Sequence, residues 1–351
     1  MPKCVFIDNG ISISPDGMVR PCCHIDINKD SLTHISDFDW DNSFPDLRKK
    51  MENGWARECN ACKKDELKNG NSPRTKYEKY SIPGNTKTIF DLKITNTCNL
   101  SCRMCTPSQS STWDKIVKQN KDLKLHRFHK RLTPLDSPRN WHSKNFDDIA
   151  ERFNNVKRLK LTGGEPFLVK QAKTVCQNTV DTGASKDAAL KIITNGQVEL
   201  DSEWLSILNN FNNVSIDVSV DGIGSRYEYI RPGSKFSAVE KFINKIKQTV
   251  PHVEIGATYL PQTLNASIYY DTQDWAKSMD IEIYNDVDWQ LIDPYFMNYS
   301  SLKPSLREKF NIETNIPYVE ENFTKLVDFM RNLDKIHGTD IEKECPELFD
   351  E

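Results

Sequence analysis

The chain has 351 residues, of which 37% are hydrophobic and 28% are charged, and its formal net charge is −3. A charge so close to neutral excludes a uniformly basic nucleic-acid binder, and no apolar run approaches the roughly 18 residues that a membrane span needs. The N-terminus, Met1-Pro2-Lys3-Cys4, has no apolar signal region, so we expect a cytoplasmic protein. In that reducing compartment, ten cysteines indicate metal ligands or catalytic groups rather than disulfides.

The first predicted segment, residues 1–87, is rich in cysteine and polar residues and poor in apolar runs. Ser14-Pro15-Asp16-Gly17 predicts a hairpin turn, with Cys4 and Cys22 at the bases of two paired strands. Cys59 and Cys62 form a CxxC motif further on, and a polar linker follows. Cys23 could replace Cys22, but the spacing from the turn favours Cys22. Four such thiols can hold an iron–sulfur cluster or a tetrathiolate zinc ion, and the metal would supply stability that burial cannot.

From residue 88 onwards, strand-like and helical patterns alternate. We expect strands near 88–95, 156–162, 189–194, 214–220, 253–259 and 281–287. Helical stretches between them include 168–182, 202–211, 235–249 and 271–279. This alternation predicts an α/β fold, a partial (β/α)6 TIM-like barrel over residues 88–300. Residues 301–351 should form C-terminal helices and a loose acidic tail.

Polar motifs follow four of the predicted strands. Cys98 follows the first strand, Gly163-Gly164-Glu165-Pro166 the second, Asn195 the third, and Ser219 and Asp221 the fourth. Because chemistry in parallel β/α folds collects at the carboxyl ends of the strands, we expect these residues to share one rim.

The segment Cys98-Asn-Leu-Ser-Cys102-Arg-Met-Cys105 places three thiols within eight residues of one loop. Three thiolates can hold one face of a four-iron cluster and leave the fourth iron open to a cofactor or substrate. The alternatives are three buried structural cysteines or a zinc site that lacks one ligand.

This triplet resembles the hallmark of the radical S-adenosylmethionine (SAM) superfamily. The resemblance implies a [4Fe-4S] cluster on Cys98, Cys102 and Cys105 whose open iron binds SAM. It also implies reductive cleavage of SAM to a 5′-deoxyadenosyl radical, which abstracts a hydrogen atom from a substrate. A flavodoxin- or ferredoxin-type protein would donate the electron.

The same resemblance implies a set of SAM contacts. The GGEP turn, with Gly163, Gly164 and Glu165, is similar to the superfamily's turn at the methionine ammonium, although a lone turn of this kind can also be a helix start. Met104 stands where an aromatic residue usually lies against the adenine. The remaining implied contacts are Asn195, Ser219 and Asp221, with Arg231 on the SAM carboxylate.

The N-terminal cysteines Cys4, Cys22, Cys59 and Cys62 resemble the auxiliary-cluster modules called twitch and SPASM. This resemblance implies a second [4Fe-4S] cluster with four protein ligands, in a module that here precedes the barrel. Three cysteines are left over: Cys176 is predicted to be a core thiol, Cys345 to be incidental in the tail, and Cys23 has no assigned role.

The segment from Lys121 to Lys144 carries seven Lys or Arg, two Asp and three His, with Phe128 and Trp141 interleaved. Its composition is typical of contact with nucleic acid or an acidic peptide, and equally of a solvated insertion. Three functions therefore stay open. They are an enzyme that modifies a peptide or protein, an enzyme that modifies or dehydrogenates a small metabolite or nucleotide, and a non-enzymatic iron–sulfur or zinc interaction protein.

Overall fold

The computed structural model describes residues 3–26, 32–120, 149, 151–284, 291 and 293–350. These residues fall into two compact units. Unit 1 comprises Met1–Asn96, Pro138–Ile193 and Leu200–Ser215, and unit 2 comprises Thr97–Ser137, Thr194–Glu199 and Ile216–Glu351. The units divide the chain differently from the three predicted segments, because the cysteine-rich N-terminus shares unit 1 with the first strands of the predicted barrel.

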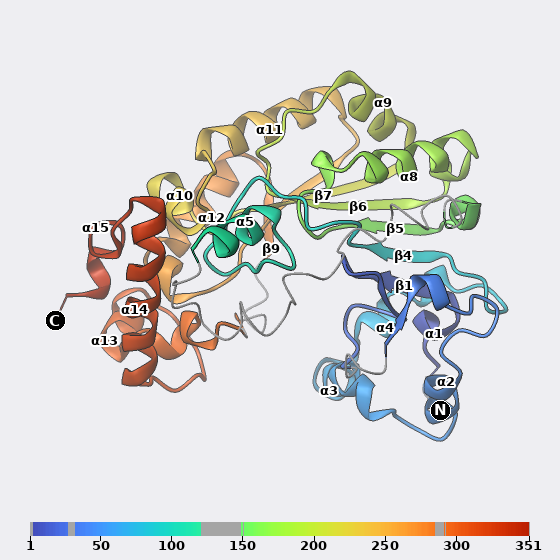
Figure 1. Ribbon diagram of the computed structural model, residues 1–351, viewed down its shortest axis with the longest axis horizontal. Coiled ribbons are helices and arrows are strands. Elements are labelled where there is room, and N and C mark those ends of the chain that lie inside the picture. Colours follow the sequence, from blue (N-terminus) through green and yellow to red (C-terminus); the bar gives the residue numbers. More distant parts are fainter. Residues whose placement is uncertain are drawn as a thin grey trace. The chain divides into compact units, whose positions relative to one another are not determined.

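Unit 1 is built on a sheet with the strand order β3-β2-β1-β4-β5-β6-β7 (Figure 1). The strands are β1 (Gly10–Ile13), β2 (Met18–Arg20), β3 (Thr33–His34), β4 (Ile89–Leu92), β5 (Arg158–Leu161), β6 (Ala189–Thr194) and β7 (Asn213–Ser219), of which β6 and β7 end in unit 2. β2 pairs antiparallel with β1 and with β3. β1 then pairs parallel with β4, and the parallel ladder continues through β5 to β6. The N-terminal hairpin therefore extends the parallel sheet.

The predicted hairpin turn is confirmed. Gly17 has a φ of 79°, a conformation that glycine adopts without steric cost, and the Ser14 amide donates to the Met18 carbonyl at 3.1 Å. The expectation that Cys4 stands at the base of a strand is wrong, because Cys4 precedes a short helix, α1 (Val5–Asn9), that leads into β1. Cys22 follows the end of β2, as predicted.

The other α-helices of unit 1 are α2 (Pro45–Glu52), α3 (Asn60–Asn69), α4 (Pro73–Lys76), α8 (Lys170–Asp181) and α9 (Ser202–Asn210). α8 and α9 lie side by side along the sheet (Figure 1), and Lys173 on α8 bonds Asp201 and Glu203 at 2.6 and 2.8 Å. Cys176 on α8 is completely buried, which agrees with the prediction of a core thiol.

Unit 2 contains the parallel pair β8 (Glu254–Thr258) and β9 (Glu282–Tyr284). Its α-helices are α5 (Ser111–Gln119), α10 (Gly224–Ile230), α11 (Phe236–Thr249), α12 (Tyr269–Ser278), α13 (Pro304–Lys309), α14 (Glu320–His337) and α15 (Ile341–Glu344). All six predicted strands and the four named helices are therefore present, and the predicted α/β class is confirmed. In the part of the chain that the structure describes, no helix is long and apolar enough to cross a membrane.

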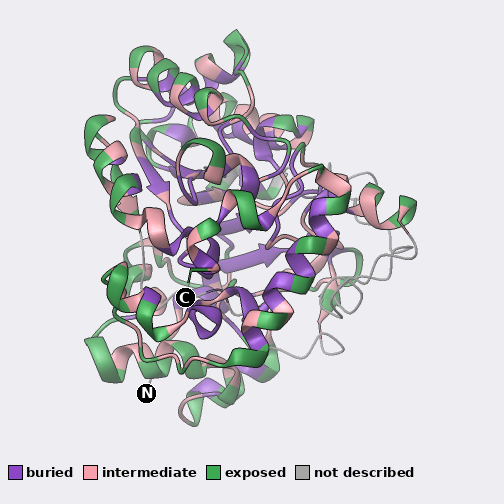
Figure 2. Cartoon of the chain, turned by 90° about the vertical axis from the view of Figure 1, so that its left-hand side faces the viewer, coloured by how far each residue is buried: buried purple, intermediate pink, exposed green. Residues whose placement is uncertain are grey.

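The C-terminal segment is not the loose acidic tail that its composition suggested. Ile341, Cys345 and Leu348 recur every three or four residues and are all buried in an apolar cluster with α14. Glu347 forms an ion pair with Arg226 at 2.8 Å. Figure 2 shows that the strands are mostly buried and that many helices are exposed along one side. Cys345 is thus a core thiol rather than an incidental one.

Candidate functional site

In unit 2, the loop that carries Cys98, Cys102 and Cys105 is held by the first turn of α5. Side chains of this turn donate to three carbonyl groups of the loop. The bonds run from Ser111 Oγ and Thr112 Oγ1 to the Cys98 carbonyl at 3.2 and 2.8 Å, from Ser110 Oγ to that of Leu100 at 2.6 Å, and from Trp113 Nε1 to that of Cys102 at 2.8 Å. Because these carbonyls point at the helix, the loop backbone is fixed before any ligand binds.

The other side of the loop pairs with the segment that follows α10. The Ser101 amide donates to the Pro232 carbonyl at 3.1 Å, and the Arg103 amide donates to that of Ile230 at 3.0 Å. These two bonds flank Arg231 and place its guanidinium beside the middle cysteine. Arg231 Nη1 lies 3.7 Å from the Cys102 sulfur.

Asp221 fixes the orientation of this arginine. Its completely buried carboxylate accepts from Arg231 Nε at 2.8 Å and lies 2.6 Å from Arg231 Nη2. The other carboxylate oxygen accepts from the Leu260 amide at 2.9 Å. Two residues predicted to contact SAM are thus paired with each other, which leaves Nη1 as the part of the arginine that faces the cysteine loop.

The three thiols influence one another electrostatically. Burial raises the pKa of Cys102 to about 11, and the Arg231 cation opposes that rise whereas Cys98 adds to it. Burial, followed by the charges of Cys102 and Cys98, also raises the pKa of Cys105. Asn195 Nδ2 lies 3.9 Å from the Cys98 sulfur and donates to Asn99 Oδ1 at 2.8 Å. The structure therefore brings the triplet, Asn195, Asp221 and Arg231 into one region of unit 2.

Two other residues that are predicted to contact SAM, Ser219 and Met104, also belong to unit 2. Ser219 ends β7 and is half-buried, and Met104 packs against the apolar cluster of α14.

The GGEP turn lies in unit 1, directly after β5. Gly163 has a φ of 76°, and a Cβ there would lie 2.7 Å from the Lys93 Cβ, so no larger residue fits. Glu165 is completely buried and caps a 3₁₀-helix, Pro166–Leu168, by accepting from the Phe167 amide at 3.1 Å.

The four N-terminal cysteines gather in unit 1 around a small apolar cluster. Cys4, Cys22 and Cys59 pack against Ile7, Ile25, Leu47, Met51 and Ala56. Burial raises the pKa of Cys4 to about 11 and that of Cys59 to about 12, and Cys62 contributes to both increases. The pKa of Cys22 is raised by burial and then by Cys4. The four thiols are therefore close enough to interact, whereas Cys23 is exposed.

Among the described residues, no three His, Cys, Asp or Glu side chains converge closely enough to hold one metal ion. A single zinc ion needs thiolate ligands that all lie about 2.3 Å from one centre. A four-iron cluster spreads its ligands over four metal atoms and needs a wider arrangement of thiols.

Sequence reasoning missed a buried ion pair directly behind the cysteine loop. Arg103 is completely buried, and its Nη2 lies 2.8 Å from Asp334 Oδ1 on α14. Its Nε donates to the Tyr229 carbonyl at 2.6 Å, and its guanidinium carbon lies 3.8 Å from the centre of the Tyr229 ring. An aspartate amid the apolar residues of α14 was the available signal, but nothing in one sequence pairs it with an arginine 231 positions away.

Comparison with known proteins was decisive for the family. The profile of the radical SAM superfamily matches residues 92–266, a range that includes the cysteine triplet, the GGEP turn and Arg231. The chain belongs to the radical SAM superfamily. The predicted family and its partial-barrel fold are thereby confirmed.

Individual relatives are more distant. The sporulation killing factor maturation protein SkfB of Bacillus subtilis (strain 168) is 25% identical over 157 residues, which cover 45% of this chain and 31% of SkfB. The structure of native anSMEcpe with bound AdoMet and Cp18Cys peptide is 17% identical, with a TM-score of 0.41, over 70% of this chain and 60% of that one. Streptococcus suis SuiB bound to precursor peptide SuiA is 14% identical, with a TM-score of 0.36, over 89% and 69%. The chain thus matches about a third of the length of SkfB.

The basic segment from Lys121 to Lys144 lies outside the described residues, so its predicted contact with nucleic acid or an acidic peptide stays a prediction.

Proposed function

We propose that this protein is a radical SAM enzyme that abstracts a hydrogen atom from a peptide or protein substrate. The observation that carries the proposal is the loop of Cys98, Cys102 and Cys105 with the Arg231 guanidinium 3.7 Å from the Cys102 sulfur. Three thiols on a preformed loop, beside one fixed cation, fit the ligand set of a four-iron cluster with an open iron. Such a cluster, when bound with SAM, supplies reductive cleavage to a 5′-deoxyadenosyl radical.

The residues of this chain have separate tasks in that reaction. The three cysteines bind the cluster as thiolates, and the positive charge of Arg231 stabilises the anionic form of Cys102. Asp221 orients Arg231, whose Nη1 edge is the part left to meet the SAM carboxylate. Asn195, Ser219 and Met104 bind further parts of SAM.

The second part of the proposal is an auxiliary [4Fe-4S] cluster on Cys4, Cys22, Cys59 and Cys62. It is supported by the mutual influence of the four thiols and by their apolar surroundings. With four protein ligands, the site has no open position for substrate, so its task is electron transfer or stabilisation of the fold. A peptide or protein substrate is supported by SkfB, whose name describes it as a maturation protein.

The test is made on anaerobically reconstituted protein with dithionite and SAM. We expect 5′-deoxyadenosine to form slowly without substrate and faster with the right peptide, and deuterium from a labelled peptide to appear in 5′-deoxyadenosine. A Cys98→Ala variant is the control and should produce none. If wild-type protein with a full complement of iron yields no 5′-deoxyadenosine, the proposed activity is wrong. If label transfers only from small metabolites, the peptide assignment is wrong.

A further inference from the structure

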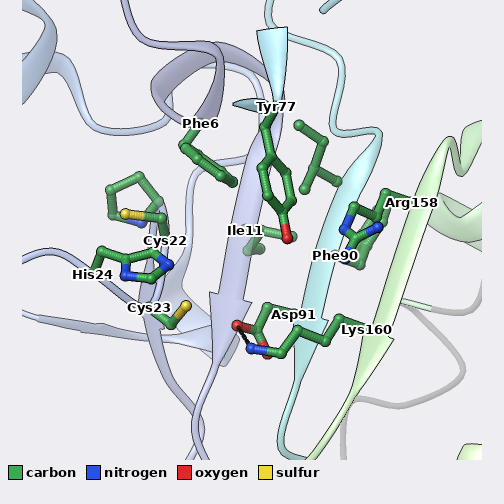
Figure 3. A pocket seen from close by; sticks show the side chains of 12 residues that line it. Phe6, Ile11, Cys22, Cys23, His24, Tyr77, Phe90, Asp91, Arg158 and Lys160 are labelled. Atoms are coloured by element: carbon green, nitrogen blue, oxygen red, sulfur yellow. Dashed lines mark hydrogen bonds and ion pairs between the residues drawn. The ribbon is translucent and has the colours of Figure 1, made fainter. Parts of the chain in front are cut away.

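Unit 1 contains a pocket that adjoins the proposed auxiliary-cluster site (Figure 3). It opens between the hairpin, the segment around Tyr77 and strands β4 and β5. Its polar lining consists of Cys23, His24, Tyr77, Asp91, Arg158 and Lys160, and its floor and wall are apolar. Cys22, a proposed ligand of the auxiliary cluster, also lines it.

Strand register explains why these charges meet. Asp91 on β4 stands directly opposite Lys160 on β5, and the two side chains form an ion pair at 3.2 Å. Arg158 lies two residues before Lys160 and therefore points to the same face of the sheet. Both strands belong to a parallel ladder, so the positions of these side chains are set by the backbone rather than by a mobile loop.

The pocket has an excess of positive charge. Lys160 and Arg158 supply two cations, whereas Asp91 is the carboxylate that balances one of them.

Arg158 is the cation without a carboxylate partner in the pocket. Its guanidinium carbon lies 4.7 Å from the centre of the Tyr77 ring, and its Nε is buried with no hydrogen-bond partner among the described residues. A buried donor of this kind costs free energy unless a ligand or water satisfies it. The aromatic ring holds the guanidinium in place, which leaves its remaining donors ready for a planar anion.

Cys23 lines the same pocket, and chemical modification of its thiol can report on what binds there. It is the only exposed cysteine of the ten, all of which are described, and Figure 3 shows its sulfur on the side of Asp91 and Lys160. Cys22 contributes the adjoining wall, and its own thiol belongs to the group with Cys4 and Cys62. A molecule in the pocket would therefore lie beside the ligands of the proposed auxiliary cluster.

We propose that this pocket binds a carboxylate of the substrate, namely an acidic side chain of the peptide, between Arg158 and Lys160. The assignment of that carboxylate to a peptide rests on the proposed function, whereas the binding of a carboxylate does not. Arg158 binds the carboxylate through two parallel hydrogen bonds, and Lys160 shares its charge between the ligand and Asp91. The apolar wall of Phe6 and Phe90 contacts the methylene groups of the side chain.

Alkylation of Cys23 tests the proposal without any turnover. Iodoacetate carries a carboxylate and iodoacetamide does not, yet both react with the same thiolate, forming an S–C bond and releasing iodide. The measured quantity is the rate with iodoacetate divided by the rate with iodoacetamide. With anaerobic holoprotein at one mildly alkaline pH, we expect this ratio at Cys23 to exceed the ratio for glutathione by about tenfold, because the pocket concentrates the anion. Peptide mass spectrometry assigns the modified residue. A ratio equal to that of glutathione would overturn the proposal.

Two variants should move this ratio in opposite directions. Arg158→Gln removes a cation and should lower the ratio severalfold, whereas Asp91→Asn removes the balancing anion and should raise it. A general loss of structure would move both the same way. Lys49→Gln, which removes an exposed charge on α2 of the same unit, is the matched control and should leave the ratio unchanged. An unaltered ratio in Arg158→Gln, with circular dichroism showing a folded protein, would contradict the assignment.

Protection of Cys23 from iodoacetamide distinguishes the source of the carboxylate. A blocked Ala-Ala-Glu-Ala-Ala peptide should slow the reaction, and its Gln counterpart should not. Protection by glutarate but not by the Glu peptide would overturn the peptide assignment and leave a small-molecule carboxylate site. Because none of these measurements uses SAM cleavage, a failure of the proposed activity would be recognised separately by the absence of 5′-deoxyadenosine.

Discussion

The two groups of cysteines in this chain are assembled in different ways. The unit 2 triplet lies on one loop of eight residues, and that loop is tied on one side to α5 and on the other to residues 230–232. The unit 1 thiols come from separate pieces of chain: the residue before α1, the end of β2 and the start of α3. One continuous loop presents the first group, whereas the second forms only when separate segments of the chain pack together.

The two groups also differ in their charged neighbours. Arg231 lies beside the sulfur of Cys102 and is held there by a completely buried aspartate. Around Cys4, Cys22 and Cys59 the neighbours are mostly apolar, and burial is the main cause of their raised pKa values. This contrast suits a reactive cluster that must receive charged SAM and a closed cluster that only exchanges electrons.

Loss of the triplet should have the largest effect of any change. Anaerobically purified wild-type protein should carry about eight irons, and replacing Cys98, Cys102 and Cys105 with Ala should leave about four and abolish SAM cleavage. Iron and zinc are both measured by elemental analysis. Four irons and one zinc in the wild-type protein would refute the auxiliary cluster but not the SAM cluster.

Removal of Cys59 and Cys62 should separate the two clusters functionally. We expect this variant to lose product formation. Its cleavage of SAM in the absence of substrate should stay close to the wild-type rate, because the unit 2 cysteine loop contains neither Cys59 nor Cys62. Circular dichroism must accompany the assay, since metal binding and folding are coupled in small modules. A folded variant that makes product at the wild-type rate would show that the second cluster takes no part in turnover.

Substitutions at the Arg231–Asp221 pair should have an intermediate effect. Arg231→Gln should keep its iron but bind SAM at least about tenfold more weakly than the wild type, because it removes a charged partner of the SAM carboxylate. Asp221→Asn should have a similar effect if the orientation of Arg231 is what matters. Equilibrium binding of SAM to the oxidised protein provides the measurement. Wild-type affinity in both variants would mean that the carboxylate contact lies elsewhere.

Sequence reasoning succeeded where the decisive residues are close together in the chain. The triplet, the GGEP turn and the hairpin at Gly17 are local patterns, and each predicted turn or loop is present. It failed where distant segments meet. The Arg103–Asp334 pair joins residues 231 positions apart, and the facing of Asp91 and Lys160 depends on strand register. The acidic residues around Cys345 also made the apolar spacing of the C-terminal segment hard to recognise, so the burial of Cys345 was not predicted.

The Arg103–Asp334 pair tests how far the unit 2 loop depends on α14. Asp334→Asn leaves the Arg103 charge buried without its counter-charge, so the free energy of unfolding should fall by about 3 kcal/mol. The matched control is Arg331→Gln, which breaks an exposed ion pair with Glu342 and should cost less than about 1 kcal/mol. Urea titration monitored by circular dichroism distinguishes them. Equal losses in the two variants would show that the buried pair has no special weight.

His337, next to this pair, should give the smallest effect. Burial, together with the Arg103 cation, lowers the pKa of His337 to about 4 from its ordinary value of 6.5. Between these two pH values the unfolded chain binds more protons than the folded one, so stability rises with pH across this window and falls as the solution is acidified. Because part of the ring is exposed to solvent, we expect the change to be roughly 1 kcal/mol.

His337→Gln should flatten the dependence of stability on pH between 6.5 and 4, because a glutamine in this position has no proton to gain. Thr324→Ser, an exposed substitution on α14 that changes no titratable group, should leave the dependence as it is in the wild type. Urea midpoints at several pH values within the window provide the measurement. If the His337 variant retains the wild-type slope, His337 takes up its proton over the same pH range in the folded and the unfolded chain, and burial beside Arg103 does not lower its pKa.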